Sequence, residues 1–169
     1  GSAGAGSFPH LIGEMFKASA QVDIVHVPYK GSAPALVDVL GGQLSMAFVT
    51  PVSAISLVRS GKLRAIAVTG TRRLLALPEV PTLSEAGVRG VDIPLWFGFV
   101  VPKKTAPEVV AVLHREISVV IDSLEFARAA ESEGAFVVGR SPSNFTQRIR
   151  TDLAIVEKLV KSTNLKVDE

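Results

Sequence analysis

The chain has 169 residues, of which 47% are hydrophobic, so it can bury a core as one domain or two small ones. Its 18 basic and 16 acidic residues leave a formal net charge of +2, and no stretch combines clustered Lys and Arg with aromatic residues, which argues against nucleic-acid binding. The lack of cysteine excludes disulfides and thiol nucleophiles, and no apolar run approaches the roughly 20 residues that span a bilayer, so we expect no direct membrane insertion.

Helical and strand-like patterns alternate in the first part of the chain. Apolar residues with helical spacing follow Ser7, Ser32 and Thr50, three hydroxyl residues that are typical N-caps. Short β-branched runs lie between these stretches, bounded by Pro and Gly. The sequence therefore predicts helices over 8–18, 32–40 and 50–61, and strands over 22–27, 44–49 and 63–69.

The second part begins with a long connection over 70–90. This connection contains a capping box, Thr82 followed three residues later by Glu85, and therefore one short helical turn. A second capping box is predicted at Thr105 and Glu108. We expect strands over 95–101 and 135–138, and helices over 105–121, 123–134 and 141–161. Trp96 is predicted to lie in the core, as large aromatics in strands usually do.

This order of elements predicts an α/β fold with a mainly parallel sheet covered by helices. Because a helix comes first, we expect a strand to precede it. We place a lobe boundary after residue 92, which divides the chain into 1–92 and 93–169.

In such a sheet the N-termini of the helices gather at the carboxyl ends of the strands, where ligands bind. Free backbone N–H groups and the positive ends of helix dipoles favour an anion, so a carboxylate or a phosphate is the expected ligand. Ser and Thr are also the commonest structural caps, and a glycine-rich terminus can simply be flexible. Tyr29 and Lys30 could serve a ligand, or they could pack and lie in solvent.

The sequence contains no recognisable catalytic, cofactor or metal constellation. The dinucleotide template fails because Pro9 replaces its last glycine, and the phosphate-loop template fails because Gly61-Lys62 lacks both the upstream glycine, where Ser56 stands, and the following Ser or Thr. His10, His26 and His114 lack partners at metal-ligand spacing, and we interpret His10 and His26 as hydrogen-bonded structural residues. We expect no metal, no cofactor and no enzyme activity.

Five segments in order carry a specific resemblance: GSAGAGSFPHLIGEMFK, VDIVHVPYKGSAPALVDVLGGQLSMAF, SGKLRAIAVTGTRR, ALPEVPTLSEAG and WFGFVVP. They resemble the extracytoplasmic receptors of tripartite tricarboxylate transporters, the Bug family. The resemblance implies a two-lobed, class II periplasmic-binding-protein-like fold, a periplasmic location, a small mono- or dicarboxylate as ligand and membrane subunits of the transporter as partners. It also implies that 1–92 is the second lobe and that 93–169 is the return segment of an incomplete first lobe.

By this resemblance the ligand cleft is lined by loops at the starts of three helices. The residues concerned are Ser2, Gly6, Ser7, Tyr29, Lys30, Gly31, Val49 and Thr50. Many relatives carry Asp at the position of Val49, and Val49 cannot pair with a substrate ammonium group, so an apolar or hydroxylated acid is favoured over an amino acid.

The incomplete first lobe has a further consequence. We expect the segment 95–101 and the helices after Ala106 to expose apolar surface and to cause self-association. Two other functions stay open from the residues alone: an α/β enzyme, and a ligand-sensing domain of a regulator.

Overall fold

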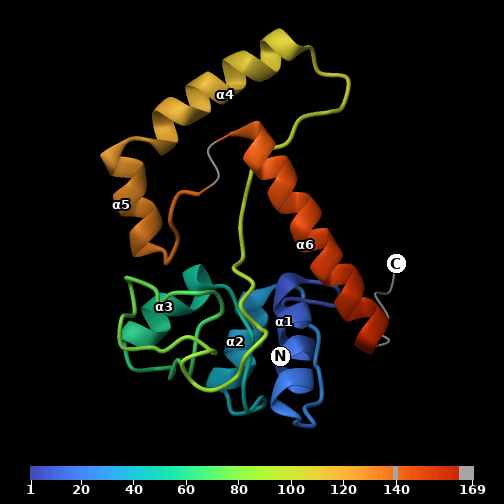
Figure 1. Cartoon of the computed structure of the whole chain (residues 1–169). Helices are drawn as coiled ribbons and strands as arrows, with labels where there is room; N and C mark the ends of the chain where they lie inside the picture. The colour runs from blue at the N-terminus through green and yellow to red at the C-terminus, as the bar shows by residue number, and fades with distance from the viewer. Residues whose placement is uncertain (139–140, 164–169) are drawn as a thin grey trace.

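The computed structural model describes residues 1–138 and 141–163 of the chain (Figure 1). Within these residues the chain forms helices in two groups, three before residue 60 and three after residue 106. Their bounds are α1 Phe8–Ala20, α2 Ser32–Leu40, α3 Pro51–Arg59, α4 Pro107–Ile121, α5 Leu124–Ser132 and α6 Pro142–Thr163. Every helix predicted from the sequence is therefore confirmed, with small shifts at the ends.

The start of α1 follows its local sequence. The hydroxyl of Ser7 accepts a hydrogen bond from the backbone N–H of His10 over 3.4 Å, and Pro9 occupies the first turn, where its missing N–H costs nothing. The prediction for Ser32 is wrong, because the N-cap of α2 is Gly31 and Ser32 is already the first helical residue.

The predicted capping box at Thr105 is also wrong. The N-cap of α4 is Ala106, in an extended conformation (ψ 139°), and no side chain caps the helix. Pro107 explains this start, because the residue before a proline is driven out of the helical region. The box at Thr82 is confirmed: the Thr82 N–H donates to the Glu85 carboxylate over 2.8 Å, and the Glu85 N–H donates to the Thr82 hydroxyl over 3.1 Å.

The predicted strands do not form ladders in the part of the chain that the structure describes. Parallel pairing there is limited to isolated bridges, Ser2 with Pro28 and Val68 with Thr82. The ranges concerned are 22–27, 44–49, 63–69, 95–101 and 135–138. Apolar alternation marks an extended segment but does not say which other segment pairs with it. The expectation of a regular parallel sheet is corrected to a few parallel contacts.

Residues before Pro94 form a packed body around α1, α2 and α3 (Figure 1). One buried cluster lies between α3 and the connection that follows it, and the other lies between α1 and the segment 83–93. The buried members are Ile55, Ala76, Leu77 and Val80 in the first cluster and Ile12, Leu83 and Val91 in the second.

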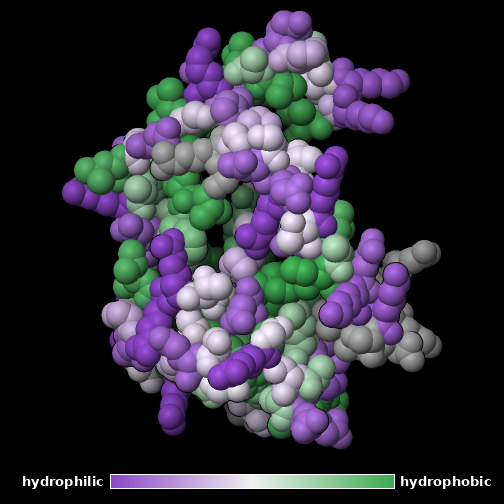
Figure 2. Space-filling view, in the orientation of Figure 1, coloured by the Kyte–Doolittle hydropathy of each residue, from purple (hydrophilic) through white to green (hydrophobic). Residues whose placement is uncertain are grey.

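Residues 95–138 and 141–163 form an arch of α4, α5 and α6 above this body, and α6 returns to contact α1 (Figure 1). No residue of α4 or α5 is buried. Large apolar side chains are exposed along the arch, and Figure 2 shows hydrophobic atoms on its surface. They include Phe97 (83% exposed), Phe99 (75%), Val100 (79%), Val119 and Leu124. The expected apolar exposure is confirmed, whereas the division into lobes at residue 92 stays a prediction.

Trp96 is only half-buried, which corrects its assignment to the core. Its ring meets Phe145 of α6 edge to face, with 5.1 Å between centroids. Among the described residues no helix has the length and apolar character needed to cross a membrane.

Candidate ligand-binding site

Parallel backbone segments bring the starts of α1, α2 and α3 to one edge of the body. Residues 1–3 exchange backbone hydrogen bonds of 2.9–3.2 Å with 27–31 on one side and with 46–48 on the other. On both sides the pattern is the parallel one. Because each segment runs in the same direction and then enters a helix, the three N-termini open together, as the helix starts in Figure 1 show.

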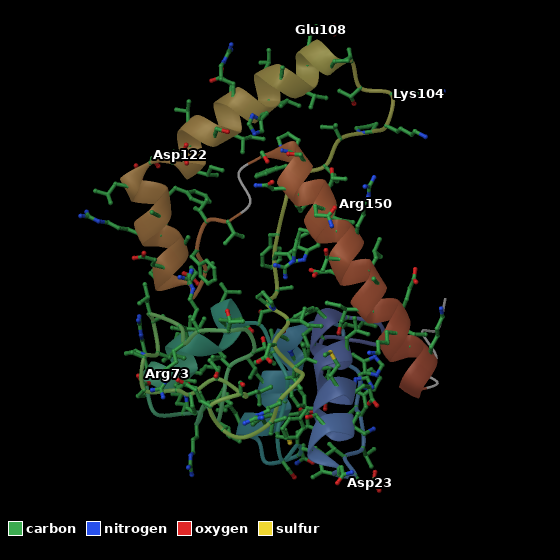
Figure 3. The ribbon with its side chains drawn as sticks, in the orientation of Figure 1. Asp23, Arg73, Lys104, Glu108, Asp122 and Arg150 are labelled. Atoms are coloured by element: carbon green, nitrogen blue, oxygen red, sulfur yellow. The ribbon has the colours of Figure 1, made fainter. Side chains whose placement is uncertain are left out.

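These helix ends are not neutralised by acidic side chains of their own. The first turns of α1, α2 and α3 contain no acidic residue, whereas α4 and α5 begin with Glu108 and Glu125. No side chain caps α2, which begins after Gly31, or α3, which begins after Thr50. Asp23 lies at the opposite end of α1 from this edge (Figure 3). Unsatisfied N–H groups and partial positive charge therefore gather where the three helices start.

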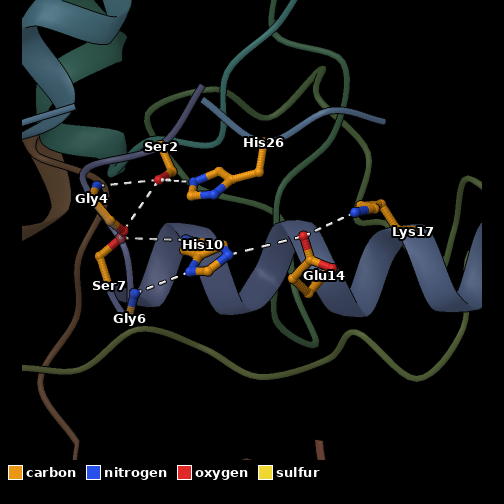
Figure 4. Close-up of polar contacts among 8 residues, drawn as sticks. All are labelled: Ser2, Gly4, Gly6, Ser7, His10, Glu14, Lys17 and His26. Atoms are coloured by element: carbon orange, nitrogen blue, oxygen red, sulfur yellow. Dashed lines mark hydrogen bonds and ion pairs between the residues drawn. The ribbon is translucent and has the colours of Figure 1, made fainter. Parts of the chain in front are cut away.

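The glycine loop, which we define as residues 1–7, is organised around Ser2. This residue is only 1% exposed. Its hydroxyl oxygen accepts from the Gly4 N–H over 3.2 Å and lies 2.6 Å from Nε2 of His26 (Figure 4). Gly4 has φ +131°, and a Cβ there would lie 3.0 Å from the Tyr29 carbonyl oxygen, so only glycine fits without strain. The loop is thus a defined structure held by its own side chains.

Gly6 and Ser7 complete the loop. The Gly6 N–H donates to Nδ1 of His10 over 3.0 Å, and the Ser7 hydroxyl donates to the Gly4 carbonyl over 2.6 Å. Both groups are therefore satisfied within the chain, so neither offers a free donor to a ligand in this arrangement.

His10 and His26 stack on each other beneath the loop. Their ring centroids are 3.8 Å apart and their planes differ by 9° (Figure 4). Nε2 of His10 lies 4.0 Å from the Glu14 carboxylate, which also pairs with Lys17 over 3.1 Å. The prediction that both histidines are hydrogen-bonded is confirmed. The stack itself was missed, because the two residues are 16 positions apart and no sequence signal connects them.

The surroundings of His26 favour its neutral ring. Burial lowers the pKa of His26 from its ordinary value, and His10 lowers it further, against an opposing effect of Glu14. Nδ1 of His10 accepts a hydrogen bond from the Gly6 N–H. A proton bound to that nitrogen would face the Gly6 hydrogen, and the hydrogen bond would be lost.

The turn Tyr29–Lys30–Gly31 lies beside the glycine loop, joined to it by the bond from the Gly31 N–H to the Ala3 carbonyl. The Tyr29 hydroxyl donates to the Asp38 carboxylate over 2.6 Å, and this hydrogen bond raises the pKa of Tyr29. That hydroxyl is therefore directed to α2. Lys30 is exposed, and within the described ranges its ammonium forms no hydrogen bond or ion pair.

Val49 and Thr50 connect the third parallel segment to α3. The Thr50 hydroxyl lies 3.1 Å from the hydroxyl of Ser53, which donates to the Thr50 carbonyl over 2.7 Å. Ser53 was not predicted, because the capping-box pattern requires Glu or Gln at this position and Ser does not match it. The structure thus brings Ser2, Gly6, Ser7, Tyr29 and Gly31 together and places Val49 and Thr50 on the adjoining segment. That all eight predicted residues, Lys30 included, line one ligand stays a prediction.

The contact between the Ser2 hydroxyl and the His26 imidazole resembles part of a nucleophilic site. Two facts argue against that role. Ser2 is buried, and the nearby carboxylate of Glu14 pairs with His10 and Lys17 instead of orienting His26. The described residues also contain no cluster of His, Asp and Glu that could hold a metal ion.

The sequence matches the tripartite tricarboxylate transporter family receptor over residues 1–165. A UPF0065 protein from the clcB–clcD intergenic region of Pseudomonas knackmussii is 36% identical over 138 residues, which are 81% of this chain and 82% of that protein. Protein BugT of Bordetella pertussis is 32% identical over 162 residues, or 96% of this chain and 50% of that protein. The chain spans about half the length of most curated relatives that it matches.

Solved structures agree with the sequence matches. A structure of an R. palustris protein with adipate has a TM-score of 0.88 and 32% identity, covering 95% of this chain and 54% of that one. MatC from Rhodopseudomonas palustris with bound malate has a TM-score of 0.81 and 28% identity, covering 92% and 54%. The arrangement of this chain is therefore that of part of a periplasmic binding protein.

Proposed function

Because the chain belongs to the tripartite tricarboxylate transporter receptor family, we propose that it forms part of an extracytoplasmic receptor that binds a small organic carboxylate for transport. The observation that carries the proposal is the convergence of three helix N-termini that lack acidic residues in their first turns. Such an edge stabilises an anion by backbone donors and helix dipoles.

A dicarboxylate is the substrate class that the similar proteins support. Two solved structures of similar fold hold adipate and malate, both of which carry two carboxylates. The donors of this chain include the starts of α2 and α3 and the exposed Lys30 ammonium, which together suit one carboxylate. Val49 adds an apolar contact next to Thr50, so we infer an acid without an ammonium group.

The receptor acts outside the cytoplasmic membrane, in the periplasm, and hands its ligand to membrane subunits of the transporter. Support for this part comes from the family and from the similar solved structures. The alternatives, an enzyme or a regulatory sensing domain, gain no support, because the Ser7 and Thr50 hydroxyls bond to backbone and to Ser53 instead of to a base.

A thermal-shift series on the chain and on the longer receptor tests the proposal. Adipate, malate and monocarboxylates of matched length are compared with uncharged amides of the same acids. Stabilisation by the acids, growing as RT ln(1 + [L]/Kd), is expected for the longer receptor. If a broad set of organic acids shifts the melting temperature of neither protein, the receptor function is wrong.

A further inference from the structure

His10 and His26 hold the glycine loop at two points. Nε2 of His26 lies 2.6 Å from the Ser2 hydroxyl, and Nδ1 of His10 accepts the Gly6 N–H over 3.0 Å. The rings stack at 3.8 Å, so each fixes the position of the other. The start and the end of the loop are thereby tied to one structural unit, which we call the histidine pair.

This bonding decides which loop amides stay available. The Gly4 and Gly6 N–H groups are occupied by Ser2 and His10. Among the described residues, the N–H groups of Ala3 and Ala5 have no acceptor. The two available amides alternate with the two occupied ones, so the conformation that the pair imposes leaves Ala3 and Ala5 as the donors of the loop.

We propose that His10 and His26 are positioning residues for the ligand: as a stacked pair they hold the glycine loop with the Ala3 and Ala5 amides available to a carboxylate, and a proton on Nδ1 of His10 releases the Gly6 end of the loop. The inference rests on the proposed function for the identity of the ligand. That the histidine pair fixes the glycine loop is independent of the proposed function.

Some of the charged groups around the histidine pair favour a positive charge on His26, and others oppose it. From α1, the Glu14 carboxylate favours a protonated ring, whereas Lys17 opposes it and also pairs with Glu14. Two rings 3.8 Å apart cannot both carry a positive charge without strong repulsion.

Solvent can reach the pair. A cavity of about 20 Å³ borders His10, His26, Glu14 and Lys17, which is room for about one water molecule. The depressed pKa of His26 agrees with a fold that prefers the neutral ring. A proton added to Nδ1 of His10 therefore competes with the hydrogen bond that this nitrogen accepts from the Gly6 N–H.

The test uses variants that keep the hydrogen bonds but cannot titrate. The amide of His10→Asn reaches about as far as Nδ1 and can accept the Gly6 N–H, and that of His26→Gln reaches about as far as Nε2 and can bond to Ser2. His10→Leu and His26→Leu remove the bonds. All variants are made in the longer receptor and in the chain itself.

In the binding experiment, the Kd of adipate and of malate is measured by calorimetry between about pH 7.5 and about pH 5. The acids titrate too, so the quantity of interest is the ratio of the Kd of the wild type to that of the double variant His10→Asn, His26→Gln at each pH. We expect this ratio to rise several-fold on acidification, by at most about tenfold per pH unit for each coupled proton. A constant or falling ratio overturns the proposal, because a merely structural pair would not move it.

An experiment without ligand tests the effect of the histidine pair on the loop separately from ligand binding. The protection factor of the Gly6 amide, measured by hydrogen exchange in NMR, is expected to fall on acidification in the wild type and to stay constant in His10→Asn. Equal protection of the Gly6 amide at both pH values contradicts the proposal that protonation releases the loop, regardless of the binding results for adipate and malate. If Gly6 protection falls on acidification but neither adipate nor malate binds at any pH, the proposed function is wrong, whereas the effect of the histidine pair on the loop is supported.

Discussion

The indole N–H of Trp96 donates a hydrogen bond to Oδ2 of Asp152, 56 residues further along the chain. The same oxygen accepts from Nε of Arg148 over 2.8 Å, so one carboxylate oxygen of α6 joins the helix to the segment 95–101. Trp96 is the only tryptophan in the sequence. Its fluorescence therefore reports on the contact between this segment and α6.

Removal of this carboxylate tests the contact. Asp152→Ala is expected to shift the Trp96 emission to longer wavelength and to lower the free energy of unfolding by about 1–2 kcal/mol, because both donors lose their acceptor. Urea unfolding followed by fluorescence measures both quantities. Leu153→Ala, an exposed neighbour on the same helix, serves as the control and is expected to leave the emission unchanged. An unchanged emission in Asp152→Ala would disprove the contact.

The capping box at Thr82 and Glu85 predicts a pH-dependent contribution to stability. Arg73 beside the Glu85 carboxylate, with the Thr82 N–H, lowers the pKa of Glu85. A carboxyl whose pKa is lower in the folded state stabilises the fold above its unfolded pKa, and this contribution is lost as pH falls through the folded pKa. Glu85→Gln is expected to remove that part of the pH dependence between about pH 5.5 and about pH 3. Parallel pH profiles of the two proteins in urea unfolding would contradict this expectation.

Thr82→Ala probes the other half of the same box. Loss of the hydroxyl leaves the Glu85 N–H without its acceptor, and we expect a loss of about 1 kcal/mol in the free energy of unfolding. Thr82→Ser keeps the hydroxyl and is expected to retain most of that stability. Urea denaturation of the three proteins measures the difference, and equal midpoints for Ala and Ser would show that the hydroxyl contributes nothing.

Lys30 offers a test of the proposed carboxylate site. Lys30→Ala in the longer receptor is expected to weaken binding of adipate or malate by about 1–3 kcal/mol and to leave the melting temperature of the ligand-free protein nearly unchanged. Lys62→Ala removes an exposed lysine beyond the end of α3 and is the matched control. Calorimetry compares the affinities. Equal affinity in all three proteins would show that Lys30 is a solvated side chain that does not contact the ligand.

The exposed apolar side chains of the arch predict association of the 169-residue chain. Phe97 and Phe99 are 83% and 75% exposed, and such patches bind to each other in water. Sedimentation velocity is expected to show oligomers that dissociate in the double variant Phe97→Ser, Phe99→Ser. A wild-type chain that stays monomeric at high concentration would contradict the prediction.

Local signals in the sequence predicted part of the local structure: the cap at Ser7 and the box at Thr82 are confirmed, whereas the cap at Ser32 and the box at Thr105 are wrong. Ser7 and the box at Thr82 act within one helical turn, so the residues that matter are neighbours in sequence. The strands could not be predicted in the same way, because a segment such as 22–27 becomes a strand only when distant backbone pairs with it. The resemblance located the glycine loop, but the bonds that close its Gly4 and Gly6 amides come from Ser2 and His10 and are visible only in three dimensions.

The three-residue segment that lies between 27–31 and 46–48 has a consequence for the order of folding. Its partners are 25 to 47 residues away along the chain, whereas Val68 pairs with Thr82, which is closer in sequence and begins the capping box with Glu85. Closing longer loops costs more chain entropy, so we expect the pairing near Thr82 to form early and the glycine loop to become ordered last. Pulse-labelled hydrogen exchange during refolding should protect the Leu83 amide before that of Gly6. A destabilised chain would then lose the edge where the three helices start while the rest of the body is still folded.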